Sequence, residues 1–274
     1  MVRLPRSQSA PSSKAGFRLP WRDILDVLAM GTWSAMLMRY WFGGKLLLLL
    51  HPDYAWLSNS AAVILCLLTI YKLVNIIKQL IRQSGAATNR RSKGAEGHLA
   101  LLPGNLSSAI LLAVAVFGLI YTPRAFASQT AEQRGIADTL TLTRAQPQRF
   151  ARAASPEERT IIDWIRLVNV SPEPDAYTDE AVAIEGFVIY PEEWPEGYLM
   201  LSRFVLTCCA ADAYPVGLPV KLPEGAAGEQ RYPVDSWLSV RGQIFTETLD
   251  GRRQIAIAPT SVEEIEEPDN PYEY

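Results

Sequence analysis

Three long apolar segments lie within the first 121 residues, and they constrain the fold of this chain more than any other feature. They cover residues 24–42, 56–80 and 102–121. A helix that crosses the hydrocarbon core of a membrane, about 30 Å thick, needs roughly 20 apolar residues. The first two segments have this length, and the third approaches it. The sequence therefore predicts a membrane α-helical N-terminal region of about three helices.

Charge divides the chain at the same place. Before Ala125 there are 14 Lys and Arg against 4 Asp and Glu, and from Ala125 onward there are 12 against 25. A basic, apolar half followed by an acidic half indicates a membrane region, residues 21–124, followed by a soluble domain. We expect the lipid bilayer as a partner and no nucleic acid, because phosphate binding needs clustered cations.

Basic residues also predict the orientation in the membrane, since cytoplasmic loops accumulate Lys and Arg. The tail 1–20, which we expect to be disordered, is basic. The loop after the second apolar segment carries Arg82, Arg90, Arg91 and Lys93. Both therefore belong in the cytoplasm. Three crossings then place everything after Arg124 outside, which predicts a multi-pass cell-membrane protein with an extracytoplasmic C-terminal domain.

Residues 125–154 are polar without a sustained period and are expected to be a linker to a β-rich domain, residues 155–274. Ser155, Pro156 and Glu158 form a capping-box pattern that predicts the start of a helix. Apolar residues follow at helical spacing, and we expect Trp164 among them to pack on a sheet. The acidic run 263–274 is expected to be a solvated tail.

Strand-like alternation begins near Glu180. Strands are predicted over residues 181–190, 198–211 (one bent strand or two), 218–223, 237–248 and 253–265, with a hairpin turn at 249–251. Gly186 and Gly242 lie inside two of these strands, where a glycine lets a strand coil around a barrel corner. The pattern predicts a small, mainly-β, OB-like barrel with one flanking helix.

Cys208 and Cys209 are the main candidate site, and three interpretations remain open. Both can be small buried residues, since free cysteine is among the most buried types. They can hold a soft metal ion or metalloid with Asp212, because thiolates are soft ligands, although neighbouring side chains on a strand point to opposite faces. They can also form a strained, labile vicinal disulfide or thiol switch.

Asp212 has a plainer interpretation as a turn-forming residue that caps backbone amides. The chain contains no GxSxG, no HExxH and no phosphate-binding glycine loop, so we expect no enzyme. An OB-like barrel also allows a saccharide-binding module that uses exposed aromatics such as Trp194 and Tyr198.

Several stretches in order resemble the YcgQ-like family of bacterial membrane proteins, whose biochemical activity is not established. They are GKLLLLLHPDY, PRAFASQTAEQRG, FVLTCCAADAYPVGLPV, WLSVRGQIF and the final PYEY. The resemblance covers most of the chain from about Trp21, and CCAAD is its most specific part. It implies a location beside a membrane permease and marks Cys208, Cys209, Asp212 and His51 as positions of interest.

These observations favour a non-enzymatic accessory subunit of a permease or transporter, with an outer β-domain whose cysteine pair binds a soft metal or metalloid. A thiol-redox protein that uses Cys208 and Cys209 is the first alternative. An OB-like module that binds a saccharide or another ligand is the second.

Overall fold

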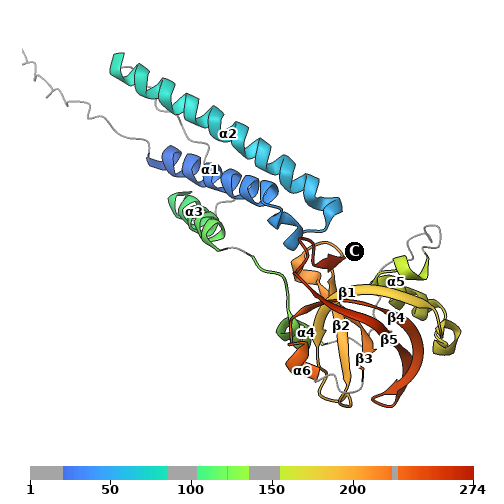
Figure 1. Ribbon diagram of the computed structural model, residues 1–274. Coiled ribbons are helices and arrows are strands. Elements are labelled where there is room, and N and C mark those ends of the chain that lie inside the picture. Colours follow the sequence, from blue (N-terminus) through green and yellow to red (C-terminus); the bar gives the residue numbers. More distant parts are fainter. Residues whose placement is uncertain (1–20, 86–103, 122, 136–154, 224–227) are drawn as a thin grey trace, which may run out of the picture. The chain divides into compact units, whose positions relative to one another are not determined.

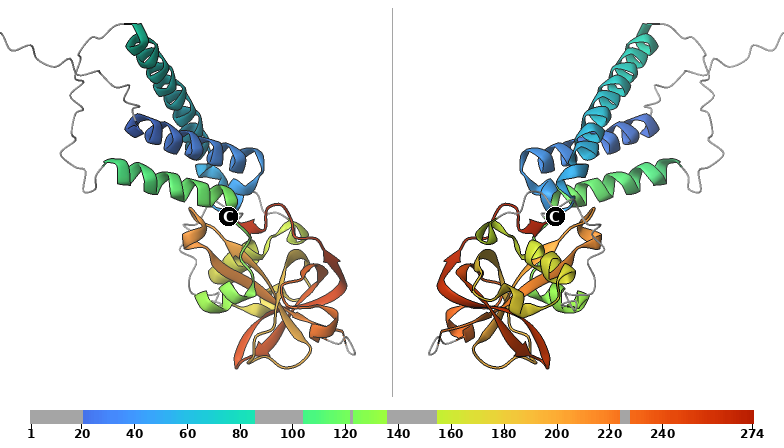
Figure 2. Two further views of the ribbon diagram at one scale, coloured as in Figure 1. Left: turned by 90° about the vertical axis from the view of Figure 1, so that its left-hand side faces the viewer. Right: turned by 90° about the vertical axis from the view of Figure 1, so that its right-hand side faces the viewer.

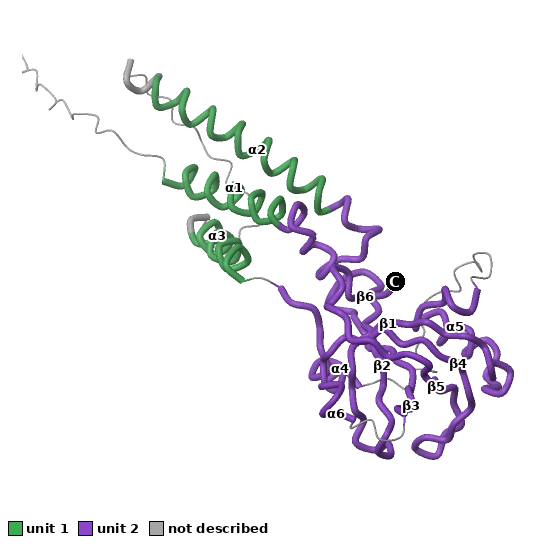
Figure 3. The backbone as a smooth tube through the Cα atoms, viewed as in Figure 1, with its two compact units in different colours: residues 1–39, 58–122 green, residues 40–57, 123–274 purple. Residues whose placement is uncertain are grey.

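The computed structural model describes residues 21–85, 104–121, 123–135, 155–223 and 228–274 (Figure 1). The predicted disordered tail 1–20, the basic residues 90–93 and most of the linker, residues 136–154, lie outside this range. The chain forms two compact units (Figure 3). Unit 1 combines Met1–Arg39 with Ser58–Thr122, and unit 2 combines Tyr40–Leu57 with Pro123–Tyr274.

Unit 1 is helical. It contains most of α1 (Trp21–Phe42) and α2 (Pro52–Gly85) and all of α3 (Gly104–Ile120), which overlap the three predicted apolar segments. The last residues of α1 and the first of α2 belong to unit 2. Polar side chains join the three helices. Asp26 of α1 lies 2.8 Å from the Lys72 ammonium of α2 and accepts a 2.5 Å hydrogen bond from Ser108 of α3. Ser34 also donates to the carbonyl of Ala62. These contacts make α1 the helix to which the other two are hydrogen-bonded.

The prediction of about three membrane-spanning helices is only partly confirmed. Among the described residues, one helix, Pro52–Ile81, is long and apolar enough to cross a membrane, and Leu106–Ile120 is a shorter apolar helix. Four charged residues lower the hydropathy of α1: Arg22, Asp23, Asp26 and Arg39. The 17 residues of α3 extend about 25 Å at 1.5 Å per residue, which is less than the hydrocarbon thickness.

Unit 2 contains a five-stranded β-barrel, as predicted. Its strands are β1 (Ala181–Ile189), β2 (Tyr198–Val205), β3 (Tyr214–Lys221), β4 (Trp237–Leu249) and β5 (Arg252–Ile265). They pair in the order β1-β4-β5-β3-β2, and a β1–β2 pairing closes the circuit. The β3–β5 pair is parallel and the other barrel pairs are antiparallel. The curved strands surround a common interior in the two views of Figure 2.

Two glycines permit the curvature, as the sequence predicted. A Cβ atom at Gly186 would lie 2.6 Å from the carbonyl oxygen of Ser202 on the neighbouring strand. Gly242 lies at a register shift between β4 and β5, where a Cβ atom would meet the Ala258 carbonyl. The predicted hairpin is also confirmed, because Asp250 and Gly251 have φ angles of 49° and 70°, as a two-residue type I′ turn requires.

The flanking helix α5 (Ile161–Val170) begins later than predicted. Ser155 opens a separate 3-10 turn, η2 (Pro156–Glu158), and Arg159 is extended. Thr160 is the actual N-cap, and its side chain accepts a hydrogen bond from the Asp163 amide. The capping-box pattern therefore occurs twice in succession, and the second copy starts the helix. Trp164 is fully buried in the core cluster of the barrel, which confirms its predicted role.

The acidic C-terminal run is not a solvated tail, contrary to the prediction. Tyr272 and Glu273 form β6 (Tyr272–Glu273), which pairs in parallel with β2, and both are buried. The Glu273 carboxylate accepts hydrogen bonds from the amides of Ile161 and Ile162, at 3.3 and 2.7 Å. This carboxylate therefore occupies the positive end of α5, where the first amides of a helix lack internal partners.

The first part of the predicted linker packs on the barrel. It contains helix α4 (Ser128–Arg134), whose Ala131 is buried in a core cluster. Phe126 contacts the ring of Phe204 at 5.3 Å between centroids. The remaining short elements of unit 2 are η1 (Lys45–Leu48), η3 (Pro174–Tyr177), η4 (Ala210–Asp212) and α6 (Gly228–Arg231).

Candidate metal site

The two cysteines lie in a turn between β2 and β3, which we call the cysteine turn and define as Thr207–Ala213. Strand β2 ends at Val205, so the prediction of strand over residues 198–211 is wrong beyond that point. The expectation that neighbouring cysteines point to opposite faces does not apply in a turn. Cys208 is exposed, and Cys209 is half-buried.

Asp212 organises the turn. Its carboxylate accepts hydrogen bonds from the amides of Cys208 and Cys209, at 2.9 and 3.2 Å, and from the Thr207 hydroxyl. Its own amide donates to the carbonyl of Cys209 at 3.0 Å. The prediction that Asp212 caps backbone amides is therefore confirmed. Side-chain bonds of this kind compete with strand pairing, which explains why β2 stops before the cysteines.

The turn brings both sulfur atoms to one place. The Sγ atoms of Cys208 and Cys209 lie 3.7 Å apart, and one ligand atom from each of Cys208, Cys209 and Asp212 falls within 4.8 Å of the others. The separation is far beyond the roughly 2.05 Å of a disulfide, and all three cysteines of the chain are free. Two thiolates bound to one tetrahedral zinc ion, each about 2.3 Å from it, stand about 3.8 Å apart. The observed separation matches this value.

Electrostatics keep the Cys208 thiol protonated at neutral pH in the absence of a cation. The hydrogen bond to Asp212, together with the neighbouring Cys209 thiol, raises the pKa of Cys208 to about 11. Burial pushes the pKa of Asp212 upward, but hydrogen bonds from Thr207, the Cys208 thiol and the two backbone amides hold it below its ordinary value. Cys208 is thus a thiol and Asp212 a carboxylate. Because the thiolate is the nucleophile, this arrangement disfavours a reactive cysteine.

His51 reaches the turn through its backbone rather than its ring. Its amide donates to the carbonyl of Cys208 at 3.1 Å. The imidazole Nδ1 accepts a hydrogen bond from the Asp53 amide, and the ring meets Tyr274 edge-on at 4.7 Å. The structure therefore places His51 beside the predicted ligands, but its side chain is not in the cluster of ligand atoms that the described residues form.

Three groups that shape the turn were not predicted from the sequence. Thr207 directly precedes the cysteine pair, so a local pattern of hydroxyl, thiols and carboxylate could have suggested it. Arg134 of α4 donates to the carbonyls of Ala210 and Ala213. Leu49 and Leu50 are bonded to the cysteine turn from about 160 positions away, and no local pattern signals such a contact.

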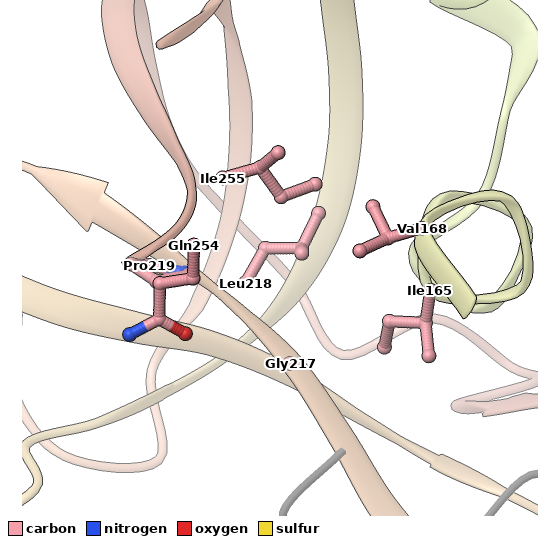
Figure 4. A pocket seen from close by; sticks show the side chains of 7 residues that line it. All are labelled: Ile165, Val168, Gly217, Leu218, Pro219, Gln254 and Ile255. Atoms are coloured by element: carbon pink, nitrogen blue, oxygen red, sulfur yellow. The ribbon is translucent and has the colours of Figure 1, made fainter. Parts of the chain in front are cut away.

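The aromatic residues proposed for saccharide binding are engaged within the domain. Trp194 packs against a core cluster. The Tyr198 hydroxyl donates to Glu247 at 2.5 Å, and Lys221 lies over the Tyr198 ring. A pocket between α5, β3 and β5, lined by Ile165, Val168, Gly217, Leu218, Pro219, Gln254 and Ile255, has a volume of only about 30 Å³ (Figure 4). Ligand pockets for organic molecules measure about 300 Å³ or more, so this one has room for water only.

The fold and the site define a chain with an N-terminal helical region and a β-barrel domain that carries a cysteine turn. Residues 161–274 match the family model described as DUF1980 C-terminal domain, an uncharacterised family. The match begins at α5 and includes every strand and the cysteine turn. No curated protein and no solved structure matched the chain. The YcgQ-like resemblance and the association with a permease remain predictions.

Proposed function

We propose that this chain is a non-enzymatic membrane protein whose β-barrel domain binds a soft divalent metal ion or a metalloid, as an accessory subunit of a membrane permease. One observation carries the metal part of the proposal. Two sulfur atoms and one carboxylate oxygen converge within 4.8 Å on a solvent-accessible turn.

The ligand set favours a thiophilic, tetrahedral ion such as zinc. Two thiolates and one carboxylate supply three protein ligands, which leaves one position open for water or for a group from another molecule. Both thiols must lose their protons on binding, so the affinity depends on pH and loading releases protons. The raised pKa of Cys208 disfavours the thiol-redox alternative at neutral pH, because a thiol switch needs an accessible thiolate.

The membrane part of the proposal includes three spanning helices, an N-terminus in the cytoplasm and a barrel outside. The span Pro52–Ile81 supports it, as do large apolar side chains exposed on both α2 and α3, which include Leu67, Tyr71, Phe117 and Ile120. Positive charges in the tail and after α2 support the orientation.

The finer description of the barrel as OB-like is also a proposal. Its support is the closed circuit of five strands with a single parallel pair, β3–β5. The permease as partner rests on the YcgQ-like resemblance. Co-purification of a permease with the chain at native abundance, after mild detergent extraction, is the expected result. Recovery of the chain alone would contradict this part of the proposal.

Metal binding is tested on the full chain in detergent or lipid nanodiscs. Titration with Cd²⁺ reports thiolate ligation through ultraviolet charge-transfer absorbance, and competition with a chromogenic chelator gives the zinc affinity. We expect one ion per chain. Cys208→Ser, Cys209→Ser and Asp212→Asn should each weaken binding at least tenfold. Cys66→Ser and Asp269→Asn are matched controls away from the turn. No thiolate absorbance in the wild type, or equal loss in the controls, would overturn the proposal.

A further inference from the structure

The connection between α1 and α2, residues 44–51, is joined to the cysteine turn by backbone hydrogen bonds. Leu50 forms an antiparallel bridge with Cys209. The amide of His51 donates to the carbonyl of Cys208 at 3.1 Å, and the amide of Ala210 donates to the carbonyl of Leu49 at 2.9 Å. These contacts lie within unit 2, which includes residues 40–57. Residues 49–51 of the connection are thus paired through their backbone with the turn that carries both sulfur atoms.

Side chains fasten the same segment to the barrel domain. Leu48 is buried and belongs to the core cluster that contains Phe204 and Leu206. On the other side of the bridge, the ring of His51 packs edge-on against Tyr274. The backbone bonds are therefore supported at both ends by packing, so the connection is held as a fixed part of the domain.

Two sources satisfy the backbone polar groups of the cysteines. Asp212 takes the amides of Cys208 and Cys209 through its carboxylate and the Cys209 carbonyl through its own amide. The connection supplies the other two partners: the His51 amide donates to the Cys208 carbonyl, and the Leu49 carbonyl accepts from the Ala210 amide. The conformation that brings the sulfurs to 3.7 Å is therefore fixed from two directions.

A metal ion changes the balance between these two sources. The Asp212 oxygens already accept bonds from the Thr207 hydroxyl and two amides, so an oxygen that turns to a cation gives up part of that set. The bonds from the connection do not involve any ligand atom. Ligation of the sulfur and carboxylate atoms would leave these bonds intact, and the turn would then depend on them more.

We propose that the α1–α2 connection, residues 44–51, is the structural brace of the metal site, so that metal binding to the cysteine turn and docking of the connection stabilise each other. This inference rests on the proposed metal function. Coupling of two equilibria is reciprocal, so metal must tighten docking as much as docking raises metal affinity. The connection is covalently continuous with α1, which ends at Phe42, and with α2, which begins at Pro52. Metal binding at the turn would therefore also restrain the last residues of α1 and the first residues of α2.

The experiment combines amide hydrogen exchange with metal titration on the full chain in nanodiscs, using Cd²⁺ or Zn²⁺ alone as the probe. In the wild type we expect metal to slow the exchange of peptides that contain the His51 and Ala210 amides. Leu48→Ala removes the buried anchor and leaves every proposed ligand residue in place, and we expect it to weaken metal affinity about tenfold, as loss of a supporting shell does. Leu47→Ala, in the same 3-10 turn but only half-buried, is the matched control and should bind as the wild type does.

The outcomes separate this inference from the proposed function. If the wild type binds no metal, the proposed function fails and the inference fails with it. If the wild type binds metal but exchange in the connection does not change, the inference is overturned and the proposed function stands. Equal affinities for Leu48→Ala and the wild type, with the barrel still folded by circular dichroism, would overturn it as well. If Leu48→Ala does not fold, the exchange measurement on the wild type still decides.

Discussion

The effect of Asp212 on the reactivity of Cys208 gives a quantitative test of the geometry. The pKa of Cys208 is raised from 9.0 to about 11, first by its hydrogen bond to Asp212 and then by Cys209. At pH 8 the thiolate fraction of Cys208 is then about one in a thousand, against about one in ten at the unshifted pKa of 9.0. Replacement of the carboxylate in Asp212→Asn removes the larger cause and moves the pKa back toward 9.

The expected change in rate is smaller than the change in thiolate fraction. A fall of two pKa units raises that fraction about a hundredfold, but it lowers the intrinsic nucleophilicity of the thiolate about tenfold. We therefore expect alkylation of Cys208 by iodoacetamide at pH 8 to accelerate by up to about tenfold in Asp212→Asn. The rate is followed on the peptide that contains Cys208 by mass spectrometry, with Asp269→Asn as the control.

Two results would contradict this prediction. A wild-type Cys208 that reacts as fast as a free thiol would show that the carboxylate does not hold the proton. An unchanged or slower rate in Asp212→Asn would show that the hydrogen bond does not control the pKa.

Three further predictions concern the fold. Burial raises the pKa of Glu273 in the folded state. The stability that protonated Glu273 contributes is therefore fully present below its ordinary pKa of 4.5 and is lost as pH rises through the higher folded pKa. Glu273→Gln should remove this pH dependence from the thermal unfolding temperature, and an unaltered pH dependence would contradict the assignment. Gly186→Ala should lower the free energy of unfolding by about 1–3 kcal/mol in denaturant titration, because the new methyl group would lie 2.6 Å from a carbonyl oxygen of β2, and a neutral effect would contradict the close approach. In a double-mutant cycle in detergent, Asp26→Asn and Lys72→Met should show a coupling energy of about 1 kcal/mol, whereas the exposed Lys78→Met should show none with Asp26→Asn.

The strands were predictable because their signal is local. Alternation places side chains of β1 and β4 in the barrel core, namely Val182, Ile184, Val188, Leu238, Val240 and Ile244. The Asp250-Gly251 pair supplies the turn that joins β4 to β5. Gly186 and Gly242 were interpreted correctly because a glycine within a strand has few uses other than close approach. In each case the signal is visible in a short stretch of sequence, although the close approaches of Gly186 and Gly242 are to residues on neighbouring strands.

Predictions failed where one carboxylate forms hydrogen bonds that composition and apolar pattern do not signal. The acidic composition of residues 263–274 suggested solvent, yet the Glu273 carboxylate finds the amides of Ile161 and Ile162 more than one hundred positions away. The cysteine pair was assigned to a strand because the run of apolar residues continues to Ala211. Local hydrogen bonds within the six residues from Thr207 to Asp212 override that propensity.

The parallel β3–β5 pair has one paired position, Val220 with Ile257, which is fewer than any other strand pair of the barrel has. Prolines 215 and 219 lack the amide that an incoming strand would need, and Ile165 and Val168 of α5 cover the neighbouring stretch. Beyond the residues of β2 that pair with β1, the two residues of β6 pair with β2 instead. A polypeptide that binds the barrel domain therefore cannot add a strand at these places and has to recognise side chains instead. The same features protect the domain against self-association through its backbone.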